Sequence, residues 1–171
     1  MFEEKDYIIQ ISKLRDEENI YNLHLNRELF EKFDCKDAED LSCELSMRIV
    51  KNERLIEIYF SFEGMMSLVC SRCLSKVEFP IKKESVLYVK FGEDYSEPDI
   101  NERIIPENEN EIDLLLYIYE ELRLEIPISP MHESEEDCDR KMIEILKVIN
   151  DQKIEEKDDF DPRWAKLKDL K

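Results

Sequence analysis

Hydrophobic and polar residues alternate along much of the first half of the chain. The clearest run extends from Leu41 to Val50, where every second residue is apolar. Its apolar positions are Leu41, Cys43, Leu45, Met47 and Ile49. A period of two is typical of a strand with one buried face. Similar apolar runs cover residues 7–14, 55–62, 65–70, 77–81 and 86–91, separated by short polar turns or by Gly64. Because these runs follow one another closely, they predict an antiparallel meander.

Two segments of the second half have the period of an amphipathic helix. Residues 112–124 present one apolar face, and Pro127 prevents that helix from continuing. A second helix is predicted after Asp139, with apolar residues spaced i, i+3, i+4 and i+7. These residues are Met142, Ile145, Leu146 and Ile149. Residues 19–33 are ambiguous, because alternation there gives way to helical spacing.

The remaining stretches have the composition of connections. Residues 92–111 are rich in acids and contain Arg103 and two prolines, which predicts an exposed acidic loop. Residues 150–160 are also acidic. Asp161 and Pro162 then suit the N-cap and first position of a short helix, in which Trp164, Leu167 and Leu170 fall at intervals of three.

These elements together predict an α+β fold. We expect an antiparallel, largely meandering sheet with two packed helices and a short C-terminal helical tail. Residues 1–150 would form a single domain, and residues 151–171 an acidic linker and the helical tail. A chain of 171 residues is long enough to bury a substantial core.

Composition excludes several classes of protein. The net charge of −18 disfavours binding nucleic acid over a broad surface. The two glycines, Gly64 and Gly92, are too few for a phosphate-binding loop or a dinucleotide-binding fingerprint. The charged start of the sequence is unlike a signal peptide, and the apolar runs are too short to span a membrane. Five cysteines are an odd number for a disulfide framework, so we expect reduced thiols in the cytoplasm.

Four residues form a candidate metal site. Cys70 and Cys73 are spaced as C-x-x-C between two predicted strands, an arrangement that lets both sulfurs point at one ion. His132 and Cys138 lie further along, in the acidic loop between the two predicted helices. A Cys3His set is an acceptable shell for one structural zinc ion.

Two other interpretations of these cysteines stay open. C-x-x-C also occurs in thiol redox enzymes, although there it normally follows a strand and opens a helix. Alternatively, the cysteines are reduced thiols that pack as small hydrophobic side chains, and His132 is an ordinary loop residue.

Several motifs in this order resemble the YceD-like family, the large ribosomal RNA subunit accumulation proteins. The sequence C-S-R-C-L follows Gly64 closely, and V-E-F-P-I comes after it. An acidic connection leads to E-E-L-R-L-E-I-P-I-S-P, and the chain closes with D-P-R-W-A-K-L-K-D-L-K. Many members have a second cysteine pair after the proline stretch, where this chain has His132 and Cys138. The resemblance implies a non-enzymatic bacterial or organellar factor that supports synthesis, processing or stability of large-subunit (23S) ribosomal RNA.

The charge pattern leaves the partner of such a factor open. Four cations near the C-x-x-C motif are candidate RNA contacts: Arg72, Lys76, Lys82 and Lys83. The acidic loops could instead hold basic ribosomal proteins. We therefore expect the partners to be the large-subunit RNA precursor, ribosomal proteins or both, with no membrane and no small-molecule substrate. The alternatives are a thiol redox enzyme that uses Cys70 and Cys73, and an adaptor that contacts only proteins.

Overall fold

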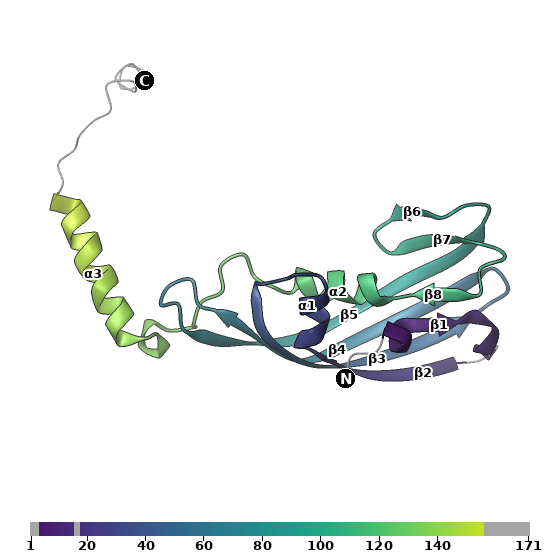
Figure 1. Ribbon diagram of the computed structural model, residues 1–171, viewed down its shortest axis with the longest axis horizontal. Helices are drawn as coiled ribbons and strands as arrows, with labels where there is room; N and C mark the ends of the chain where they lie inside the picture. The colour runs from purple at the N-terminus through teal and green to yellow at the C-terminus, as the bar shows by residue number, and fades with distance from the viewer. Residues whose placement is uncertain (1–3, 16–17, 156–171) are drawn as a thin grey trace, which may run out of the picture.

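The body of the protein is a long, twisted sheet of six strands. The computed structural model describes residues 4–15 and 18–155 (Figure 1). The strands of this sheet are β2 (Glu18–Asn26), β3 (Ala38–Lys51), β4 (Leu55–Val69), β5 (Lys76–Gly92), β6 (Ser96–Asp99) and β7 (Glu102–Pro106). They lie in the order β2-β3-β4-β5-β7-β6. β5 and β7 run parallel, and the other neighbouring strands pair antiparallel. A separate small sheet pairs β1 (Ile8–Gln10) with β8 (Glu111–Asp113).

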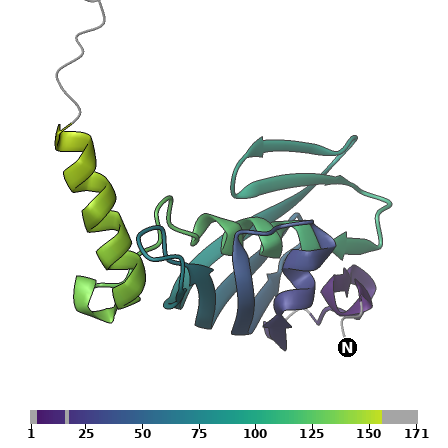
Figure 2. The same cartoon turned by 60° about the vertical axis from the view of Figure 1, so that its left-hand side comes forward.

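One face of the large sheet is covered and the other is open. Two helices, α1 (Arg27–Lys32) and α2 (Leu115–Leu124), lie over the covered face together with the small sheet (Figures 1 and 2). The core between these layers is apolar and includes Leu45, Met47, Ile58, Phe60 and Leu87 from the sheet and Phe30, Ile118 and Leu122 from the helices. A third helix, α3 (Arg140–Glu155), stands away from the sheet at one end.

The expected fold class is wrong in three respects. Strand dominates over helix among the described residues. The sheet is mixed, because residues 96–106 of the expected acidic loop form β6 and β7, and β7 joins β5 in parallel. There are three α-helices among the described residues, since the ambiguous segment 19–33 divides into β2 and the short α1. The expected C-terminal helical tail lies outside the described residues.

The loop forms strands because a few of its side chains contact the body of the protein. Ile105 of β7 is buried. The guanidinium of Arg103 lies 5.6 Å from the ring centre of Tyr117 on α2 and pairs with Glu97 at 3.1 Å. These contacts fix β7 on the sheet although most of its neighbours in sequence are acidic.

The position of Gly64 between two apolar runs suggests that a strand ends there. Instead, Gly64 lies inside β4, opposite Cys43. A Cβ atom at position 64 would lie 2.2 Å from the backbone oxygen of Ser42 and 2.5 Å from the Cα of Cys43. The glycine therefore permits a close approach of the β3 and β4 backbones, and β4 continues unbroken into its hairpin with β5. That hairpin carries the C-x-x-C motif at its tip.

Candidate metal centre

The tip of the β4–β5 hairpin is a tight knuckle of six residues, 70–75. The backbone N–H of Leu74 donates to the oxygen of Cys70 at 2.8 Å, and the N–H of Cys70 donates to the oxygen of Ser75 at 2.8 Å. Leu74 adopts a left-handed conformation with φ of 61°, which is unusual for a residue with a branched side chain. The turn buries the side chains of both Cys70 and Cys73.

The connection from α2 to α3 supplies the other two candidate ligands. Its prolines end α2, and the oxygen of Pro130 accepts a 2.7 Å hydrogen bond from the N–H of Ser71 in the knuckle. His132 lies two residues further on. A single 3-10 turn then follows, capped by Ser134, whose Oγ accepts from the N–H of Glu136 at 3.1 Å. This turn delivers Cys138, which is buried, just before α3 begins.

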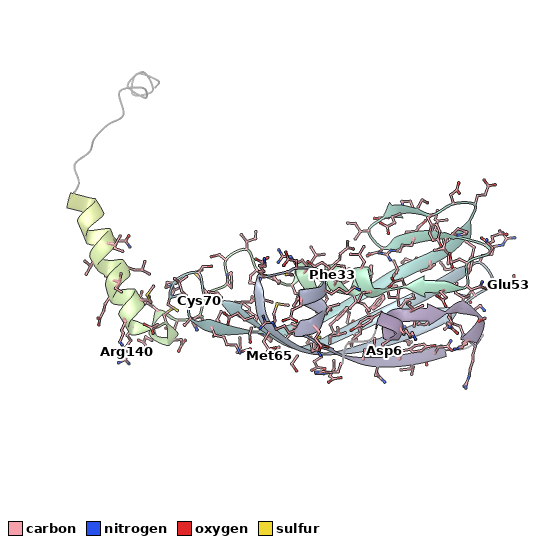
Figure 3. The ribbon with its side chains drawn as sticks, in the orientation of Figure 1. Asp6, Phe33, Glu53, Met65, Cys70 and Arg140 are labelled. Atoms are coloured by element: carbon pink, nitrogen blue, oxygen red, sulfur yellow. The ribbon has the colours of Figure 1, made fainter. Side chains whose placement is uncertain are left out.

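The two half-sites meet in space. One ligand atom each from Cys70, Cys73, His132 and Cys138 lies within 4.8 Å of every other (Figure 3, next to the labelled Cys70). Nδ1 of His132 is 3.6 Å from Sγ of Cys73 and 3.7 Å from Sγ of Cys138. Ligands bound at about 2.1–2.3 Å in a tetrahedron lie about 3.5–3.8 Å apart. The two His132 distances match this spacing and no pair exceeds it by more than about 1 Å, so the cluster could hold a metal ion after small side-chain movements.

A hydrogen bond orients the histidine for this role. Nε2 of His132 lies 3.2 Å from the backbone oxygen of Lys76, which can only accept. Nε2 therefore carries the proton, and Nδ1 is left with a lone pair that points at the sulfurs. Backbone oxygens commonly fix metal-binding histidines in this way.

The pKa values within the cluster differ strongly. Burial alone would raise the pKa of Cys73, but hydrogen bonds from Ser75 and from the backbone of Asp139 outweigh it and lower the pKa to about 6. Burial and the neighbouring thiolates of Cys73 and Cys70 raise the pKa of Cys138 to about 11. A hydrogen bond to Cys70 raises the pKa of His132. A metal ligand must be deprotonated, so a bound metal ion would displace the proton that the raised pKa of Cys138 otherwise retains.

Arg72 adds a positive charge beside the cluster. Its Nη1 lies 3.7 Å from Sγ of Cys138, and its Nη2 lies 3.9 Å from the sulfur of Met131. Three thiolates around a divalent cation leave one net negative charge, which the guanidinium can offset. Sequence reasoning missed this contact, because Arg72 and Cys138 lie 66 residues apart.

The other three candidate RNA-binding residues are divided between the two faces of β5. Lys82 is exposed on the open face, opposite Glu63 of β4. Lys76 lies on the same face and pairs with Glu78 at 3.1 Å. Lys83 points to the covered face, where it pairs with Glu121 and Glu125 of α2, both at 3.1 Å. The four candidate residues therefore do not form one basic surface.

The fold and the cluster together define a sheet protein with a Cys3His cluster at the tip of its longest hairpin. The family model described as "Large ribosomal RNA subunit accumulation protein YceD" matches residues 58–171. This match spans two thirds of the chain and contains all four cluster residues, so the chain belongs to the YceD family. Comparisons with curated proteins and with solved structures give no match. Within residues 4–15 and 18–155, no helix is long and apolar enough to cross a membrane.

Proposed function

We propose that the protein supports the accumulation of large-subunit ribosomal RNA as a non-enzymatic binding factor, and that its cluster holds one structural zinc ion. The observation that carries the proposal is the convergence of four ligand atoms within 4.8 Å, inside the region that matches the family. Two of these ligands come from the hairpin tip and two from a connection about sixty residues later. A structural metal site commonly joins segments in this way.

Zinc suits this cluster better than other common ions. Three sulfurs and one imidazole are soft or borderline ligands, which disfavour calcium and magnesium. Four protein ligands complete the tetrahedral shell that zinc adopts in structural sites. A complete shell leaves no open position for a substrate or an activated water molecule, and we therefore propose no catalytic turnover.

The low pKa of Cys73 is the observation that favours a thiol redox enzyme instead. A pKa of about 6 would make this sulfur a thiolate at neutral pH. However, a redox cysteine must also be accessible to its substrate, and Cys73 is only 2% exposed. A cysteine that binds a metal ion also needs a low pKa, but a substrate does not have to reach it. The burial of Cys73 therefore favours the metal site.

We further propose that a basic ribosomal protein, rather than bare RNA, is the direct partner. Three of the four candidate RNA contacts already have other partners: Arg72 lies against Cys138, Lys76 pairs with Glu78, and Lys83 lies between two carboxylates. The chain as a whole carries a net charge of −18, which repels phosphate and attracts basic proteins.

Two charge variants distinguish these partners. Lys76→Glu and Lys82→Glu combined should leave the associated ribosomal proteins and RNA unchanged. Glu93→Gln, Asp94→Asn and Glu107→Gln combined should weaken the association, because these exposed acids attract basic proteins at low cost to the fold. Lys83 is omitted from the first variant because it pairs with Glu121 and Glu125, and Arg72 because it contacts Cys138 of the cluster. The measurement is co-purification of ribosomal RNA and proteins with each variant from cells.

The salt dependence of association is the second readout. Loss of RNA from the first variant, with ribosomal proteins retained, would contradict the protein-partner proposal and indicate direct phosphate contacts. In that case the slope of affinity against salt should also become shallower in the first variant.

A further inference from the structure

Helix α3 has apolar residues on two sides, and the domain covers only one of them. Ile143 is buried, and Met142 and Leu146 pack against the core beside it. At about 100° per residue, Ile145, Val148 and Ile149 project from the other side of the helix. They are 51%, 56% and 43% exposed. A helix with two apolar sides is typical of one packed between two partners.

The exposed side forms a shallow groove along the helix. Lys141, Glu144, Ile145, Val148 and Ile149 line a hollow of about 350 Å³, which we call the α3 groove. The helix stands clear of the sheet along most of its length, so no described element lies over the groove (Figures 1 and 2). A groove with an apolar floor and charged rims is suited to a second amphipathic helix.

We propose that residues 161–171 of the same chain occupy the α3 groove as an antiparallel helix. This segment begins with Asp161 and Pro162, a favourable N-cap and first position. Trp164, Leu167 and Leu170 then recur every three residues and give it one apolar stripe. So short a helix is marginal in water and gains its stability from packing.

The spacing along the chain matches the groove. α3 ends at Glu155, and the five residues 156–160 separate it from Asp161. Helical hairpins commonly have connections of about 2–8 residues. Ile149 lies six residues before Glu155 and Leu167 six residues after Asp161, which places both about 9 Å from the turn. By the same count, Leu170 lies about as far from the turn as Ile145 and Leu146. Trp164 lies as far from the turn as Gln152.

Proximity favours this occupant over a second molecule. A segment joined by a short connection has an effective concentration in the millimolar range, above that of most partners in solution. The proposal does not depend on the metal ion or on any ribosomal partner.

The single tryptophan of the chain reports on this contact directly. In the full-length protein, Trp164 should emit at short wavelength and resist quenching by acrylamide, as a buried indole does. Val148→Asp and Ile149→Asp combined should shift the emission to the red and increase the quenching. These side chains lie away from the core, so circular dichroism of the sheet should not change.

A matched control uses Ile20, which is 63% exposed on β2, at a distance from α3. Ile20→Asp makes the same chemical change and should leave the emission as it is. A red-shifted, readily quenched Trp164 in the unaltered protein would overturn the proposal. A protected Trp164 whose emission does not change in the groove variant would also overturn the proposal. Protection that is lost on dilution would overturn it too, because it would assign the groove to a second copy of the chain.

Discussion

Replacing Cys73 by serine is expected to remove the metal and to lower the free energy of unfolding by about 3–5 kcal/mol. The unaltered protein, purified without chelators, should carry about one zinc ion per chain. Cys73 is one of four ligands that join the hairpin tip to the connection before α3. Without the metal, that connection keeps only a few hydrogen bonds, such as the one from Ser71 to Pro130. The measurements are elemental analysis and denaturant unfolding.

Cys35→Ser is the matched control for this variant. Cys35 is a free, partly buried cysteine outside the cluster, so its replacement should keep the zinc ion and most of the stability. Unaltered protein without any metal, together with normal stability of Cys73→Ser, would contradict the metal site. Rapid alkylation of Cys73 in the native protein would favour the redox interpretation instead.

Lys83→Ala should destabilise the fold by about 3 kcal/mol, because it leaves a buried carboxylate without its partner. The side chain of Lys83 is 19% exposed and that of Glu121 is 7% exposed. Burial tends to lower the pKa of Lys83, but hydrogen bonds to Glu125 and Glu121 outweigh it and raise the pKa. The lysine therefore stays charged, pairs with both acids and offsets one of their two negative charges. Chemical denaturation measures the loss.

Lys82→Ala is the adjacent control and should change stability by less than about 0.5 kcal/mol, since Lys82 is an exposed surface residue. Combining Lys83→Ala with Glu121→Gln should recover part of the loss, because the uncompensated charge is then removed. Equal effects of Lys82→Ala and Lys83→Ala would show that the buried ion pairs contribute little.

Local patterns in the sequence predict part of this structure well. The alternation in residues 41–50 correctly predicts β3, in which Leu45, Met47 and Ile49 are all buried. The four candidate metal ligands could be chosen from residue type and spacing alone, and the structure brings them together. The alternation and the C-x-x-C spacing are local properties, whereas the meeting of the two half-sites depends on the fold.

The parts that local patterns miss depend on contacts between distant residues. The contact of Arg103 with Tyr117 and the pairing with β5 stabilise β7. Neither contact can be recognised in the local sequence, whose acidic composition predicts a loop. Lys82 and Lys83 look like one basic pair in the sequence. Consecutive residues in a strand point to opposite faces, so the predicted strand itself already separated them.

The most direct test of the proposed function is the amount of large-subunit ribosomal RNA, relative to small-subunit RNA, in cells depleted of the protein. We expect this ratio to fall on depletion, to recover with the unaltered protein or Cys35→Ser, and to stay low with Cys73→Ser expressed at an equal level. An unchanged ratio on depletion would contradict the role in large-subunit RNA accumulation. Full recovery with Cys73→Ser would show that this role does not require the metal centre.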